Sequence, residues 1–76
     1  MAQTYNETVA AEVRAEMARQ RRSQADLAAG LGWTQAFLSR RLNDDVAFST
    51  DEIERVAGAL GIPLSQLVTP AQAATP

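Results

Sequence analysis

Residues that begin and end helices divide this sequence at short intervals. Ser23, Thr34 and Ser49 each precede a run of helically spaced apolar residues, and a hydroxyl side chain there accepts a hydrogen bond from the first helical turn. Gly32 and Gly61 end two of those runs, because glycine readily takes the left-handed conformation that closes a helix. The chain is therefore restricted to short helices joined by tight turns.

The fold predicted from these signals is all-α, with five helices. The first three are expected at Glu7–Gln20, Gln24–Leu31 and Gln35–Leu42. The fourth should begin after its cap, Ser49, and end at Gly61, and the fifth should span Pro63–Val68. We expect Asn6 or Thr4 to cap the first helix. Helical spacing predicts a set of inward-facing residues, namely Val9, Ala10, Val13, Met17, Leu27, Ala28, Leu31, Leu38, Ile53, Val56, Ala57 and Leu60. The domain should span residues 6–68, between a flexible N-terminus (1–5) and a disordered tail (69–76).

Composition agrees with a small helical domain and argues against catalysis. The chain has 76 residues, of which 46% are apolar and only 5% aromatic. Alanine and leucine dominate the apolar set, and both favour helices. Cysteine and histidine are absent, which removes thiolate nucleophiles, the commonest general base and any zinc-finger site. No enzymatic activity, metal, cofactor or small-molecule substrate is expected.

The net charge of −2 hides a polarised distribution along the chain. Residues 14–41 hold six of the seven arginines and carry +4, whereas residues 42–76 carry −4. One interpretation is a basic face that attracts nucleic acid, with a repelling face elsewhere. The other interpretation is a set of ordinary solvated helix faces, and Glu7, Glu12 and Glu16 of the first helix are expected to form one. Charge alone does not separate these interpretations.

The most specific signal lies between Gln24 and Leu42, in QADLAAGLGWTQAFLSRRL. Two helices that cross closely at a tight reversal need a small residue at the crossing, here Ala28, and a glycine at the reversal, here Gly32. Burial of apolar side chains then fixes the crossing angle, and the residues suited to this are Leu27, Leu31, Trp33 and Leu38. We expect Trp33 to fill the core between helices one and three. This spacing is typical of a helix-turn-helix, in which the second helix enters the major groove of DNA.

The segments SQADLAAGLGWTQAFLSRRLN and IERVAGALGIPLSQLV resemble the lambda repressor and Cro-like (XRE) family over roughly residues 9–68. This resemblance implies a five-helix lambda-repressor-like domain, with the helix-turn-helix formed by helices 2 and 3, that binds operator DNA and usually represses transcription. It also implies base-reading positions, which fall on Gln35, Ala36, Ser39 and Arg40. Residues expected to contact the DNA backbone are Gln24, Arg21, Arg22, Thr34, Arg41 and Asn43. A glutamine can pair with adenine and an arginine with guanine.

Several residues depart from the family pattern. Arg41 stands where an apolar core residue is usual, and we expect it to extend to the surface and pair with phosphate. Phe37 stands at a generally polar position, and three roles are open to it: covering the hydrophobic gap left by Arg41, contacting a thymine methyl, or joining a protein interface. We favour the packing role. Asp44 and Asp45 follow the reading helix closely, where they would repel phosphate, and we interpret them as helix-stop residues turned to solvent rather than a metal site.

Two functions from different classes fit these observations. The first is a sequence-specific, double-stranded DNA-binding transcriptional regulator, such as a phage Cro-like or repressor-like protein, acting as a homodimer on DNA through the region of Leu64 and Val68. The alternative is an antitoxin or adaptor that uses the same fold to bind a protein, which the acidic C-terminal half and an exposed Phe37 would suit. No membrane span or signal peptide is visible, so we expect a cytoplasmic location, in a bacterium or in the host of a phage.

Overall fold

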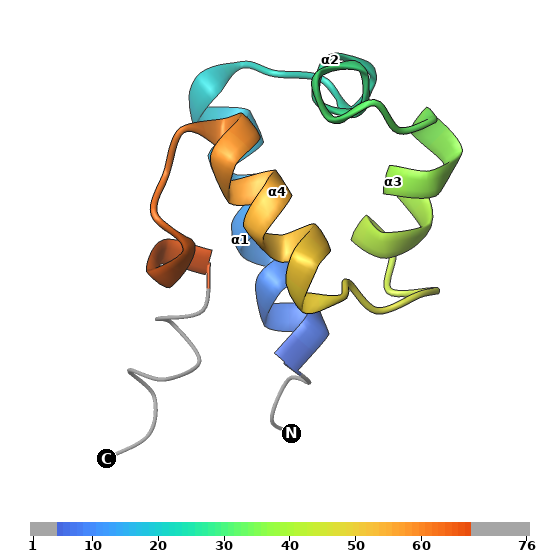
Figure 1. Cartoon of the computed structure of the whole chain (residues 1–76), viewed down its shortest axis with the longest axis vertical. Coiled ribbons are helices and arrows are strands. Elements are labelled where there is room, and N and C mark those ends of the chain that lie inside the picture. Colours follow the sequence, from blue (N-terminus) through green and yellow to red (C-terminus); the bar gives the residue numbers. More distant parts are fainter. Residues whose placement is uncertain (1–4, 68–76) are drawn as a thin grey trace.

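The computed structural model describes residues 5–67, and within them it is all-helical (Figure 1). The helices are α1 (Tyr5–Gln20), α2 (Gln24–Leu31), α3 (Gln35–Leu42) and α4 (Thr50–Leu60). A further helical turn runs from residue 64 to the last described residue, 67. The predicted bounds of the middle helices are confirmed, while α1 begins two residues earlier than expected. The predictions for residues 1–4 and 68–76 lie outside the described part of the chain. None of the described helices is long and apolar enough to cross a membrane.

The predicted start and stop signals operate as expected. Ser23 accepts a hydrogen bond from the Asp26 amide (3.0 Å), and the Asp26 carboxylate in turn accepts one from the Ser23 amide, which completes a capping box at α2. Thr34 caps α3 in the same way by accepting from the amide of Phe37 (3.1 Å). Ser49 and Glu52 form a second capping box at α4. Gly32 ends α2 at a φ of 73°.

One hydrophobic core joins the helices. The first helix packs against α3 and α4, and α2 packs against the same two helices. Every residue predicted to face inward is buried, and Leu42, Phe48 and Leu67 join them. Ala28, predicted as the small residue of a close crossing, is only 2% exposed. The core therefore holds α2 and α3 together as a helix-turn-helix on a scaffold of α1 and α4.

The C-terminal ends of three helices receive hydrogen bonds from arginines of other segments. Arg14 of α1 donates to the carbonyl of Leu42, the last residue of α3. Arg55 of α4 donates to the carbonyl of Leu31, the last residue of α2. Carbonyls at a helix C-terminus have no partner within the helix, and a guanidinium satisfies them while opposing the negative end of the helix dipole. These contacts tie each short helix to a neighbour.

The C-terminal end of α4 is held in the same manner. Arg22, in the turn between α1 and α2, donates to the carbonyl of Ala59. Gln20 donates to the carbonyl of Leu60 at 2.6 Å. Both donors come from the end of α1 or just after it, so the two long helices are joined at this end of the domain.

Two polar residues of α1 differ from their predicted roles. Asn6 lies inside the helix instead of capping it; its side chain accepts from the Phe48 amide (2.8 Å) and donates to Asp44, which fixes the loop between α3 and α4.

Glu16 was expected on a solvated face but is only 8% exposed. It accepts hydrogen bonds from Gln20, Arg19 and Gln66, and those from Gln20 and Arg19 contribute most to lowering the pKa of its carboxyl. These donors replace water around the carboxylate, which offsets the cost of its burial.

Two glycine substitutions should have opposite effects on stability. Gly32→Ala forces a β-carbon into a left-handed conformation, so we expect it to lower the free energy of unfolding by roughly 1–2 kcal/mol. Gly58→Ala, in α4 with no atom within 4 Å of the new β-carbon, should raise it by about 0.5–1 kcal/mol. Urea denaturation followed by circular dichroism measures both. Equal effects of the two substitutions would contradict the assigned backbone of the turn.

Candidate nucleic-acid interface

The side chains of α3 divide between the core and the solvent. Leu38 and Leu42 are buried, with exposed fractions of 0% and 1%. Gln35, Ala36 and Arg40, predicted to read bases, are exposed. Ser39, the fourth predicted base-reading residue, is half-buried, and its hydroxyl accepts a hydrogen bond from Asn43 (3.2 Å). The predicted positions thus share the outer face of α3.

The N-terminal ends of α2 and α3 present further polar groups. Gln24 is the first residue of α2 and is half-buried, whereas Thr34, the cap of α3, is exposed. The Thr34 hydroxyl accepts from the Phe37 amide and still has its own hydrogen to donate. The first amides of a helix have no partner within the helix and carry its positive dipole end. Asp26 already supplies a carboxylate at the start of α2, so the start of α3, which has no acidic residue in its first turn, is better suited to a further negatively charged group.

Of the seven arginines, only Arg21 and Arg40 have guanidinium groups without a hydrogen bond or ion pair to another described residue. Both are exposed. Arg21 has a φ of 55°, a left-handed conformation that is strained for any residue with a β-carbon. Arg22, predicted to contact the DNA backbone, is half-buried and bonded to Ala59. Among the described residues, Arg19 and Arg41 are paired with carboxylates, so the positive charge available to a partner is smaller than the number of arginines suggests.

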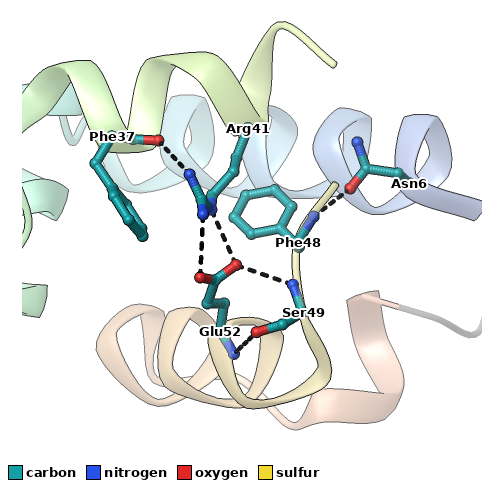
Figure 2. Close-up of polar contacts among 6 residues, drawn as sticks. All are labelled: Asn6, Phe37, Arg41, Phe48, Ser49 and Glu52. Atoms are coloured by element: carbon teal, nitrogen blue, oxygen red, sulfur yellow. Dashed lines mark hydrogen bonds and ion pairs between the residues drawn. The ribbon is translucent and has the colours of Figure 1, made fainter. Parts of the chain in front are cut away.

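Arg41 differs most from its prediction, because its guanidinium turns inward to α4 instead of extending to the surface (Figure 2). Its Nε lies 2.9 Å from Oε1 of Glu52 and its Nη2 lies 3.2 Å from Oε2. Its Nη1 donates to the carbonyl of Phe37 at 3.2 Å. The side chain of Arg41 is only 13% exposed, and that of Glu52 is 20% exposed. The charge of Arg41 is thus matched by an acidic partner within the chain.

Phe37 and Trp33 form an aromatic pair beside this ion pair. The ring of Phe37 lies 3.6 Å from the guanidinium carbon of Arg41, in cation–π geometry, and its centroid is 4.9 Å from that of Trp33. Phe37 is half-buried, which fits the packing interpretation among the three that its sequence position allowed. Trp33 is also half-buried; it packs against the edge of the hydrophobic core, and its ring lies beside Phe37 of α3 and the guanidinium of Arg55 of α4. Both rings pack along the side of α3.

Three polar residues end α3. Asn43, predicted to contact phosphate, is exposed and forms the C-cap of the helix. Asp44 adopts a φ of 69° and is held by Asn6, and Asp45 is exposed. The helix-stop interpretation of the two aspartates fits this geometry. Their charges face solvent close to Asn43, so any phosphate near that amide would also meet two carboxylates.

Sequence reasoning missed the partners of several of these side chains. Glu52 completes the capping box of α4 with Ser49, and its second role toward Arg41 joins residues of two different helices. The unusual Arg41 at an apolar position was the one available signal, because a buried arginine requires an acidic partner. Nothing in the spacing identified which of the carboxylates downstream would supply it.

Comparison with known proteins agrees with this architecture. The helix-turn-helix family HTH_3 matches residues 13–67. A crystal structure of the clp gene regulator ClgR from C. glutamicum is similar, with a TM-score of 0.86, 19% identity and coverage of 99% of this chain and 97% of that one. The hypothetical transcription factor NHTF from Neisseria is similar too, with a TM-score of 0.84, 25% identity and coverage of 93% of this chain and 82% of that one. No curated protein matches the sequence.

The chain belongs to the XRE-type helix-turn-helix family, as the resemblance predicted. Its fold class is confirmed as well, since the described residues are all-helical. Family membership makes the chain a DNA-binding transcriptional regulator, a class that is typically not enzymatic.

The Arg41–Glu52 ion pair should give stability a measurable dependence on pH. Hydrogen bonding by Arg41, above all, holds the pKa of Glu52 below its ordinary value of 4.5. A depressed folded-state pKa stabilises the protein above the unfolded pKa, and this contribution is lost as pH falls through the folded value. At neutral pH we expect Glu52→Gln to lower the free energy of unfolding by about 1–3 kcal/mol, because Arg41 loses its charged acceptor.

This difference between wild type and Glu52→Gln should shrink progressively below about pH 4.5. Urea denaturation over a range of pH provides the measurement. A difference that stays constant from neutral pH into acid would show that the pair does not stabilise the folded chain through its charge.

Proposed function

We propose that this chain binds operator DNA with α3 in the major groove and acts as a Cro-like or repressor-like regulator, of the kind that phages encode. The observation that carries the proposal is the outer face of α3, where Gln35 and Arg40 are exposed and their side chains have no partner among the described residues. Unpartnered hydrogen-bonding groups on a helix held rigidly by its other face suit the direct reading of base edges.

The chemistry of these side chains indicates which bases they read. The guanidinium of Arg40 matches O6 and N7 of guanine, and the amide of Gln35 matches N6 and N7 of adenine. Ala36 offers a methyl group that suits the methyl of thymine, and Ser39 can bond to either kind of pair. Together these groups cover only a few base pairs.

The same geometry suggests how the protein holds the DNA backbone. Arg21, Gln24 and Thr34 have donor groups that no described residue uses, and the last two stand at helix starts. Arg22 is half-buried and bonded to the Ala59 carbonyl, Arg41 is paired with Glu52, and Asn43 stands beside two carboxylates, so these three residues are less suited to phosphate. We therefore assign the contacts with the DNA backbone to Arg21, Gln24 and Thr34.

We further propose that two copies bind one operator, because a single reading helix of eight residues specifies few bases. Leu64, in the final helical turn, is 38% exposed and is the described part of the predicted dimer surface. The alternative function, binding a protein partner as an antitoxin or adaptor, relied partly on an exposed Phe37. That ring is half-buried against Arg41, so it no longer favours the alternative.

Substitutions on the outer face of α3 should abolish operator discrimination. A site is first selected from random double-stranded DNA, and the affinities of each variant for that site and for random DNA are then measured. Arg40→Ala and Gln35→Ala should each lose roughly 1–3 kcal/mol of discrimination. Arg19→Ala removes an exposed arginine paired with Glu16 and is the matched control, which should discriminate as well as wild type.

Stoichiometric titration of the selected site should show two chains per fragment. If wild type binds every sequence equally, or if Arg40→Ala and Gln35→Ala discriminate as wild type does, operator reading by α3 is wrong. A promoter that contains the site should be less active in the presence of the protein; an increase would reject the repressor assignment.

Arg21 allows its contribution to DNA binding to be separated from its contribution to folding. Arg21→Ala and Arg21→Gly both remove the guanidinium, so each should reduce the slope of log affinity against log salt by about 0.9 for each phosphate that this guanidinium neutralises. Arg21→Gly should be more stable than Arg21→Ala by about 1 kcal/mol, since glycine tolerates the positive φ of this turn. An unchanged salt slope in both variants would remove Arg21 from the interface.

A further inference from the structure

The third and fourth helices do not approach each other closely along their backbones. No Cα atom of α3 lies within 8 Å of a Cα atom of α4, whereas α2 packs closely against both. Because α1 also packs against both helices, α1 and α2 together set the approximate position of α3, and the direct connection between α3 and α4 is left to side chains that bridge the space between them. Figure 2 shows the polar bridge, in which the carboxylate of Glu52 receives the guanidinium of Arg41.

Both ends of this bridge are fixed by further contacts. Glu52 Oε1 also accepts from the Ser49 amide at 2.9 Å, so its carboxylate is anchored to the first turn of α4. The guanidinium of Arg41 is held by two hydrogen bonds to Glu52, one to the Phe37 carbonyl and the face of the Phe37 ring. A planar fork with this many contacts sets orientation as well as distance.

The bridge lies next to the base-reading side chains along α3. Arg41 directly follows Arg40, and Phe37 lies one turn before it on the same helix. A shift or roll of α3 against α4 would move the guanidinium of Arg40 and the amide of Gln35 relative to the base edges. Misplacement of a hydrogen-bonding group by a small distance weakens specific contacts while leaving general attraction to phosphate unchanged.

We infer that Arg41 and Glu52 are positioning residues for operator reading, which set the orientation of α3 without touching DNA. This inference rests on the proposed function. Arg41 acts through Glu52 and α4 instead of through phosphate, so its removal has a different signature from the removal of a residue that binds the DNA backbone.

The test compares Glu52→Gln with Glu16→Gln in the full chain. Glu16 forms the other ion pair of the described residues, with Arg19 of the same helix, so Glu16→Gln is a matched control that does not join α3 to α4. Three quantities are measured, with affinities corrected for the folded fraction: affinity for the selected site, affinity for random DNA, and the dependence of affinity on salt. Exchange of the α3 amides with solvent, relative to those of α1, supplies a readout that involves no DNA.

Glu52→Gln should weaken binding to the selected site about 2- to 30-fold while random-DNA affinity and the salt slope stay as in wild type. The α3 amides should exchange faster relative to α1 in this variant, but not in Glu16→Gln. Arg41→Leu should give the same pattern, and Arg41→Leu combined with Glu52→Gln should lose no more discrimination than the worse single substitution, because the two residues act as one unit.

Several outcomes would overturn the inference. Equal loss on both DNAs together with a smaller salt slope in Arg41→Leu would make Arg41 a phosphate-binding residue. Normal discrimination in a folded Glu52→Gln, or equal exchange of α3 in the two glutamine variants, would leave the pair with no positioning role. If wild type selects no site at all, the proposed function fails by itself, and the exchange measurement still decides whether the pair holds α3.

Discussion

Short helices have many backbone groups without partners, and the structure depends on how these are satisfied. An α-helix leaves its first four amides and last four carbonyls unpaired, which is half of all such groups in the eight-residue α2 and α3. Hydroxyl caps serve the N-terminal ends, at Ser23 and Thr34. Arginines of other segments serve the C-terminal ends, as Arg14 and Arg55 do. These arginines belong to neighbouring helices, so each hydrogen bond that caps a helix C-terminus also holds two helices together.

This use of arginine limits what remains for DNA. Five of the seven guanidinium groups are engaged within the chain. Those of Arg21, in the turn before the motif, and Arg40, on α3, have no partner among the described residues. At Arg41 a lysine could not replace the guanidinium, because three coplanar nitrogens bond to Glu52 and to the Phe37 carbonyl and an ammonium presents no such plane. The division also shows how a chain of net charge −2 can leave unpaired guanidinium groups on the surface that we propose reads bases. Local placement of two cations matters more here than the total.

Sequence reasoning predicted the parts of the fold that depend on neighbours along the chain. The caps at Ser23 and Ser49, the stop at Gly32 and the buried faces follow from residues three or four positions apart, and all were confirmed. Pairings between distant residues could not be predicted, because partner choice depends on how helices are placed in space. Asn6 with Phe48 is one such pairing, 42 positions apart. For α3 the exposed face was predicted, but the inward turn of Arg41 required knowledge of the partner on α4.

The proposed interface places few cations on DNA, and this has a consequence for how such a regulator would find its site in a genome. Affinity for arbitrary DNA comes almost entirely from phosphate neutralisation, and it increases steeply with each cationic contact. A protein with few such contacts spends little time on bulk chromosomal DNA, so most copies stay free in solution and sliding along the duplex contributes little to the search. Occupancy of the operator would then follow the total concentration of the protein closely. A small change in synthesis or degradation of the protein would then change operator occupancy directly, because little protein would be bound to other DNA and released to offset it.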